Sequence, residues 1–182
     1  DIRDGGAEVQ ANRVLAFLRR FFNWCLERDY LSQNPTAGIA KPTKEVARDR
    51  VLSPDEIGRV LNAARQMGYP FGPFVEILVL TGQRRDEVAG MRWDEVNKSE
   101  NVWVLPASRS KNGKAHTVHL SEAAMAVLTS VPRLDECDLI FPATRVRRKT
   151  EDGMRAPALP ISGFSTAKRR LDEVSGVTGW TL

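Results

Sequence analysis

The chain has 182 residues, of which 42% are hydrophobic and 27% charged, and its formal net charge is +4. This composition fits a globular protein with room for one moderate domain and part of another, and the positive charge points to an anionic partner such as nucleic acid. No apolar run approaches the roughly 20 residues that span a bilayer, and no signal segment opens the chain, so we expect no membrane contact and a cytoplasmic location.

The first predicted helix runs from about Glu8 to Tyr30. Its apolar residues recur at helical spacing, and its arginines lie on the opposite face. The apolar positions are Val14, Phe17, Leu18, Phe21, Phe22 and Cys25. A single helix cannot bury such a stripe by itself, so we expect it to dock on another element. Asn34-Pro35 then gives a turn signal, and the polar, charged residues 41–50 are typical of a linker.

A second helix is predicted from its start signals. Ser53 is a candidate N-cap, Pro54 suits the first helical position, and Glu56 stands where a capping box needs it. We expect this helix to run to about Met67 and to stop at Gly68.

Arg84 closely follows a segment that is predicted to be buried. The apolar run from Phe74 to Leu80 predicts a helix that stops at Thr81-Gly82, and a short second helix leads from Arg84 to Trp93. A guanidinium so close to a core is costly unless it is paired or bound to an anion. Taken alone, the pattern fits either an anion clamp or a pair of Arg84 with Glu87 at a helix start.

After Trp93 the pattern changes to that of strands. Residues 102–105 and 116–120 predict two strands, and Asn112-Gly113 is a tight-turn signal between them. The result is a β-hairpin with Lys111 and Lys114 at its tip.

The rest of the chain is predicted to be helical with one short buried segment. Ser121 caps a helix that ends near Thr129, residues 139–142 form the buried segment, and the final helix covers about 163–174. Together these elements predict a mainly α chain with a small antiparallel hairpin, an α+β fold.

Two stretches resemble motifs of the tyrosine recombinases, or phage-type integrases. Residues 81–87, Thr-Gly-Gln-Arg-Arg-Asp-Glu, followed by Met91-Arg92-Trp93, resemble the family's first-arginine motif. Residues 110–120 resemble its lysine hairpin, and residues 22–35 resemble the last helix of its core-binding domain. The resemblance implies a core-binding tail at 1–40, a linker at 41–50, and the N-terminal part of the catalytic domain at 51–182.

The resemblance also implies roles for single residues. Arg84 would stabilise the transition state, and Lys111 would protonate the leaving 5′ oxygen, with Lys114 as a poorer candidate. Glu87 would be structural, holding the arginine turn or capping a backbone amide, and Trp93 would belong to the core.

The implied partner is double-stranded DNA, bound in the complete protein by a homo-oligomer, a tetramer on DNA. His116 is either a phosphate contact or a plain surface residue. The other cations would follow the DNA backbone, or else are ordinary solvated charges. They are Arg85, Arg147, Arg148, Lys149, Lys168 and Arg169.

No metal or cofactor is expected. The two cysteines, Cys25 and Cys137, form no Cys-x-x-Cys pair, and the chain has no phosphate loop or dinucleotide glycine pattern. His116 and His119 are three apart on a predicted strand and point to opposite faces, so they cannot share a metal.

Half of the family's catalytic set is not found in this sequence. The His-x-x-Arg motif and the tyrosine nucleophile lie further along in tyrosine recombinases, and 179–182 resemble the approach to that motif. Tyr30 and Tyr69 stand too early in the chain to be the nucleophile, so we expect this polypeptide not to cleave DNA by itself. The alternatives are a noncatalytic DNA-binding protein on the same scaffold and an α-helical interaction module.

Overall fold

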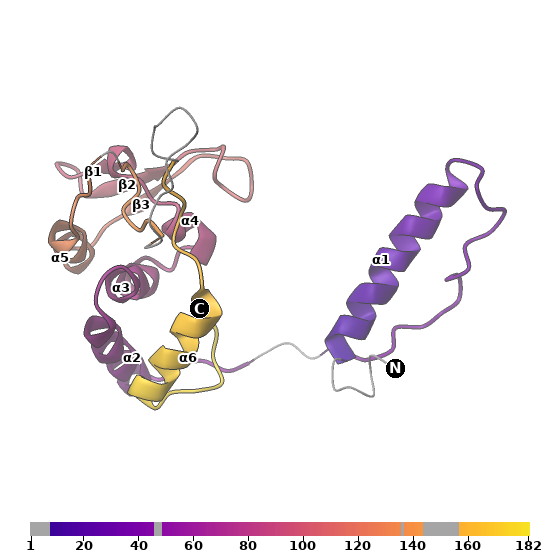
Figure 1. Ribbon diagram of the computed structural model, residues 1–182, viewed down its shortest axis with the longest axis horizontal. Helices are drawn as coiled ribbons and strands as arrows, with labels where there is room; N and C mark the ends of the chain where they lie inside the picture. The colour runs from indigo at the N-terminus through magenta and orange to yellow at the C-terminus, as the bar shows by residue number, and fades with distance from the viewer. Residues whose placement is uncertain (1–7, 46–48, 136, 144–156) are drawn as a thin grey trace, which may run out of the picture. The chain divides into compact units, whose positions relative to one another are not determined.

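The computed structural model describes residues 8–45, 49–135, 137–143 and 157–182, which divide into two units at residue 50 (Figure 1). In the first unit, α1 (Glu8–Leu26) ends before the predicted Tyr30, because the following residues turn and Asp29 takes a positive φ of 56°. Cys25 is buried, whereas Phe17 and Phe21 are 72% and 55% exposed.

Part of the predicted linker packs against α1. The buried side chain of Asn12 donates to the Thr43 carbonyl at 2.7 Å and to the Glu45 carboxylate at 2.8 Å, and it accepts the Thr43 N–H at 3.1 Å. Thr43 and Glu45 therefore belong to the first unit, inside the segment that we predicted as a linker.

The second unit begins with the capped helix that the sequence predicts. In α2 (Pro54–Met67), the Ser53 hydroxyl accepts the Glu56 N–H at 3.3 Å, and the Glu56 carboxylate accepts the Ser53 N–H at 2.9 Å. Gly68 ends the helix with a positive φ of 68°. Both predicted bounds and the capping box are confirmed.

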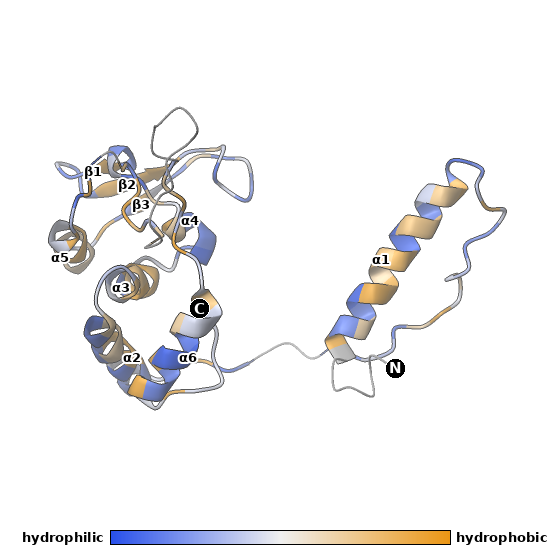
Figure 2. Ribbon diagram, in the orientation of Figure 1, coloured by the Kyte–Doolittle hydropathy of each residue, from blue (hydrophilic) through white to orange (hydrophobic). Residues whose placement is uncertain are grey.

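The apolar run forms α3 (Phe71–Thr81), which packs on α2 and on α5 (Glu122–Ser130). Gly72 permits the close contact with α2, since a Cβ at this position would lie 2.5 Å from the Ala64 carbonyl oxygen. Gly82 ends α3 in the left-handed conformation, as the Thr81-Gly82 break predicts. Figure 2 shows the apolar character of α3 beside the mixed surface of α2.

The predicted hairpin is part of a three-stranded antiparallel sheet in the order β1-β2-β3. It joins β1 (Val96–Asn97), β2 (Val102–Leu105) and β3 (His116–His119), with Trp103 opposite Val118. The Asn112-Gly113 turn exists, but it stands in a longer connection that spans residues 106–115. The sequence did not predict β1, because two residues are too few to show alternation.

The remaining elements close one core. Ser121 caps α5 as predicted, residues 139–142 are buried, and α6 (Phe164–Ser175) packs on α2. Fully buried side chains from all layers meet in this core, including Val60, Phe74, Ile77, Trp103, Leu128, Phe141 and Leu171. The predicted fold class, mainly α with a small antiparallel sheet, is confirmed. Among the helices described, none is long and apolar enough to cross a membrane.

Candidate active site

The turn before α4 (Arg85–Ala89) presents Arg84. Arg84 is extended, its N–H donates to the Glu87 carboxylate at 3.4 Å, and its carbonyl accepts the Glu87 N–H at 3.0 Å. The turn is thereby closed on itself, while the Arg84 side chain remains 53% exposed. A guanidinium in this position can reach an anion without losing its backbone anchor.

Glu87 joins the arginine turn to the lysine loop. Its side chain is 4% exposed, and its Oε1 atom accepts from Arg84 Nη1 at 3.3 Å and from the Lys111 backbone N–H at 3.4 Å. One buried carboxylate therefore holds two segments that are far apart in the sequence. This is the geometry that a structural role of Glu87 requires.

A cavity of about 480 Å³ lies at this junction. Its lining residues are Arg84, Arg85, Asp86, Glu87, Arg109, Lys111 and Leu182. The two residues predicted to be catalytic, Arg84 and Lys111, thus border one cavity. Cations outnumber carboxylates in its lining, so the cavity suits an anionic group.

His116 contacts the same turn from β3. Its Nε2 atom lies 3.0 Å from Gln83 Oε1, and the Gln83 amide nitrogen donates to the Thr81 carbonyl at 3.1 Å. Because the amide nitrogen faces Thr81, the amide oxygen faces the ring, and His116 Nε2 must carry the proton. The ring is half-buried against the arginine turn, and a phosphate contact would use Nδ1.

A second arginine, which the sequence analysis did not single out, also lines the cavity. Arg109 donates from Nη2 to the Glu95 carboxylate at 3.1 Å and to the Glu87 carbonyl at 3.3 Å. Glu95 is 9% exposed and also accepts from Trp103 Nε1 at 3.1 Å. The sequence offers one weak signal, that Arg109 precedes Lys111 by two residues. The ion pair itself appears only once the chain is folded.

These residues match a known family. The model of the Phage integrase family covers residues 50–157. The chain belongs to the phage integrase family. Among its curated relatives, the prophage integrase IntA of Escherichia coli (strain K12) is 29% identical over 147 residues, which cover 74% of this chain and 36% of IntA. The tyrosine recombinase XerD of Shewanella oneidensis is 26% identical over 155 residues, which cover 79% of this chain and 51% of XerD.

Solved structures show the same fold. A crystal structure of a lambda integrase dimer bound to a COC′ core site matches with a TM-score of 0.70 at 19% identity, covering 98% of this chain and 62% of that chain. The Tn1549 transposon integrase in complex with circular intermediate DNA matches with a TM-score of 0.61 at 14% identity, covering 100% and 63%. The predicted family and fold are confirmed. The chain itself spans 36% to 51% of the length of the two curated relatives.

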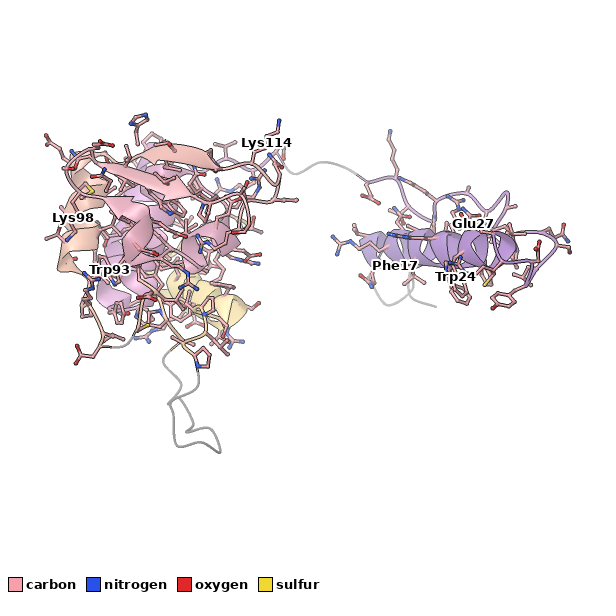
Figure 3. All side chains as sticks on the ribbon, turned by 90° about the horizontal axis from the view of Figure 1, so that it is seen from above. Phe17, Trp24, Glu27, Trp93, Lys98 and Lys114 are labelled. Carbon is pink, nitrogen blue, oxygen red and sulfur yellow. The ribbon has the colours of Figure 1, made fainter. Side chains whose placement is uncertain are left out.

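Other predicted site residues of this integrase-family chain have their own contacts. The Arg85 guanidinium lies 4.5 Å from the ring centroid of Phe164 and 3.1 Å from the Asp86 carboxylate. Trp93 is partly buried and packs against the core. Lys114 is exposed and projects outward from the second unit (Figure 3).

The two predicted cation clusters are at residues 147–149 and 168–169. Arg147, Arg148 and Lys149 lie outside the described residues. Lys168 is engaged within the integrase fold, since its Nζ atom lies 2.6 Å from both carboxylate oxygens of Asp172 and 4.2 Å from the ring centroid of Trp180. Arg169 is exposed, so it is the more accessible cation of the pair.

Tyr69 is held by the core of the integrase unit. Its hydroxyl donates to the Ile140 carbonyl at 3.1 Å, and it does not line the cavity. Burial, with a smaller contribution from Cys137, raises the pKa of Tyr69 to about 12. These contacts give Tyr69 a structural role.

Within the part of the chain that the structure describes, no three His, Cys, Asp or Glu residues gather as a metal site would require.

Proposed function

We propose that this chain supplies the first part of the active site of a tyrosine recombinase that acts in site-specific DNA recombination and integration. The observation that carries the proposal is that Arg84 and Lys111 border one cavity and are both bonded to Glu87. Arginine offers two parallel donors to non-bridging phosphate oxygens, and lysine can deliver a proton. The motifs around both residues resemble those of tyrosine recombinases.

In the proposed reaction, a tyrosine oxygen attacks the scissile phosphorus. The bond from phosphorus to the 5′ oxygen breaks, and a 3′-phosphotyrosyl link forms. Lys111 gives its proton to the departing 5′ oxygen, while Arg84 hydrogen-bonds the non-bridging oxygens as negative charge develops. Tyr69 does not line the cavity, and Tyr30 precedes both motifs in the chain, so the nucleophile would come from sequence outside these 182 residues.

The proposed substrate is double-stranded DNA, bound by a homo-oligomer of the complete protein. The lambda integrase structures, which share the fold, are those of a dimer bound to a COC′ core site and of a tetramer bound to a Holliday junction. The net charge of +4 supports an anionic partner for this chain.

We also propose that the first unit is the end of a DNA core-binding domain. The support is that α1 leaves large apolar side chains uncovered within its unit, among them Phe17, Phe21 and Trp24 (Figure 3). Such a surface suits further packing with other parts of a domain.

The first test is strand cleavage by a polypeptide that carries this sequence together with a tyrosine nucleophile. Arg84→Ala should lower the rate by about 10²–10³-fold, the usual cost of losing a donor to a developing oxyanion. The matched control is Arg65→Ala, which removes the same charge from an arginine that does not line the cavity and should leave cleavage essentially unchanged. Full activity of the Arg84 variant would refute the proposal.

The second test separates catalysis from simple DNA binding. Lys111→Ala should slow cleavage of ordinary DNA, and a 5′-bridging phosphorothiolate should restore the rate because its leaving group needs no proton. In the 182-residue chain alone, Arg84→Ala should lower the slope of log K against log salt by about 1, as expected for one lost phosphate contact. A changed slope with no cleavage in any chain that carries the tyrosine would favour a noncatalytic DNA-binding protein.

A further inference from the structure

Arg109 makes its polar contacts inside the protein. Its side chain is 23% exposed, and its Nη2 atom serves two acceptors, the Glu95 carboxylate and the Glu87 carbonyl. Its Nε atom is fully covered and has no partner among the described residues. Its Nη1 atom lies beside Gly90, where a Cβ would come within 2.5 Å of it.

These contacts distinguish Arg109 from Arg84, the other arginine paired with a buried glutamate at this cavity. Arg84 has a half-exposed guanidinium that is free to turn towards an anion. Arg109 has its Nη2 atom engaged, its Nε atom sealed from solvent, and its Nη1 atom against a glycine. A phosphate could not use the flat two-donor edge of Arg109 without breaking the pair with Glu95.

We propose that Arg109 is a positioning residue, which fixes Lys111 relative to Arg84. This inference rests on the function proposed above. The connection that carries Lys111 is held to α4 at two points, by the Lys111 N–H on the Glu87 carboxylate and by the Arg109 guanidinium on the Glu87 carbonyl. The two bonds are similar in length, 3.4 Å and 3.3 Å, but Arg109 also bonds the Glu95 carboxylate at 3.1 Å, so its side chain carries more of the placement.

Glu95 fixes the position of the Arg109 guanidinium. Its Oε2 atom accepts from Arg109, from Trp103 Nε1 and from the Arg92 N–H, each at 3.1 Å. Trp103 is fully buried in β2, so the carboxylate is tied to the sheet. Arg109 thus connects the sheet, α4 and the lysine connection through one side chain.

Gly90 offers a second way to disturb the same guanidinium. Its φ of −90° is open to any residue, so alanine fits the backbone there. The new Cβ would displace Arg109 Nη1 without removing the arginine or its charge. Gly90→Ala and Arg109→Ala should therefore give the same type of defect, and Gly90→Ala should add little when Arg109 is already alanine.

The deciding measurement is cleavage of ordinary DNA and of a 5′-bridging phosphorothiolate by the polypeptide that carries the tyrosine. We expect Arg109→Ala and Gly90→Ala to slow ordinary cleavage by about 10- to 100-fold, the size of effect that a small misplacement of a catalytic group produces. Both variants should regain much of the lost rate on the phosphorothiolate, as Lys111→Ala does. The control Arg65→Ala breaks another Arg–Glu pair, with Glu76 at 3.0 Å, and should show neither effect.

The outcomes separate the two proposals. Rescue of Lys111→Ala without rescue of either Arg109→Ala or Gly90→Ala would overturn the positioning role alone. Absence of rescue in Lys111→Ala would overturn the acid role of the lysine, and the positioning role with it. In the 182-residue chain, Arg109→Ala should speed hydrogen exchange of the Lys111 amide. The Ala124 amide, which is bonded to the Ser121 cap, should exchange at an unchanged rate. A Lys111 amide that exchanges as slowly in Arg109→Ala as in the parent chain would count against the inference.

Discussion

Replacing Glu87 by alanine tests the junction of the site without any catalytic assay. The side chain is 4% exposed and accepts three hydrogen bonds, at 3.3 Å from Arg84 Nη1 and at 3.4 Å from the backbone N–H groups of Arg84 and Lys111. The substitution removes all three acceptor contacts and leaves the Lys111 N–H without its carboxylate.

The expected cost follows from the geometry. A hydrogen bond to a charged group contributes about 1.5–3 kcal/mol at good geometry, and these three lie at the long end of the range, so each should contribute well below that. Half of the Arg84 side chain is in solvent and can be rehydrated, so the full cost of breaking a buried ion pair, about 3–5 kcal/mol, does not apply. We expect Glu87→Ala to lower the free energy of unfolding by about 2 kcal/mol.

Urea unfolding of the 182-residue chain provides the measurement. A Trp24→Phe background leaves Trp93, Trp103 and Trp180 as the tryptophans, all within the second unit, so that fluorescence reports on that unit alone. The midpoint should fall at an unchanged slope, because the surface exposed on unfolding stays the same.

Two comparisons make the result decisive. Glu87→Gln keeps one carbonyl acceptor and should cost about half as much as alanine. Asp86→Ala removes an exposed carboxylate from the same helix and should stay within about 0.5 kcal/mol of the parent. A Glu87→Ala variant as stable as Asp86→Ala would show that the carboxylate does not hold the two segments together.

Two further predictions concern the pH dependence of stability, and a third concerns the tautomer of His116. Because the folded pKa of Tyr69 is raised to about 12 from 10, the folded chain keeps a proton that the unfolded chain loses, so stability should fall as pH rises between about 10 and 12, and Tyr69→Phe should flatten that part of an unfolding-versus-pH curve. The Arg50 side chain and the capping box lower the pKa of Glu56 to about 2, so stability should be lost as pH falls from about 4.5 towards 2, and Glu56→Gln should remove this dependence in acid unfolding. Nitrogen NMR of the neutral His116 ring should show the proton on Nε2, because the Gln83 amide oxygen accepts it, and a proton on Nδ1 would contradict the assigned hydrogen bond.

The sequence predicted those parts of the fold that depend on local chemistry. Ser53 and Ser121 marked two helix starts, because a cap is a contact between residues three apart. Gly82 marked the end of α3, since its left-handed conformation favours glycine. By contrast, α1 ends before the predicted Tyr30, at a turn that no glycine or proline announces.

The site was predicted only in part for a related reason. Motif resemblance identified Arg84 and Lys111 but could not show that one carboxylate holds both. The pairs of Arg109 with Glu95 and of His116 with Gln83 join residues that are distant in the chain. Each pair joins β3 or the connection before it to a segment that flanks α4. It therefore depends on strand register and on how the sheet packs on the helices, and neither of these follows from spacing.

The ion pairs around the cavity suggest how its cations divide their tasks. Arg85 is paired with Asp86, and Arg109 with a glutamate outside the cavity, so both are already neutralised by a neighbour. Arg84 is paired with Glu87, but that carboxylate also accepts two backbone N–H groups.

Arg84 can therefore turn towards a phosphate while Glu87 remains hydrogen-bonded, which lowers the cost of the movement. Among the described residues, Lys111 is the one cation of the lining whose charged nitrogen has no carboxylate oxygen within 4 Å. An ammonium without a fixed counter-ion can respond to the charge of the leaving oxygen, as a proton donor must. A carboxylate added next to Lys111 in the chain, by Asn112→Asp, should stabilise the protonated ammonium and so slow cleavage of ordinary DNA more than cleavage of the phosphorothiolate. Equal slowing of both substrates would place the defect in DNA binding instead.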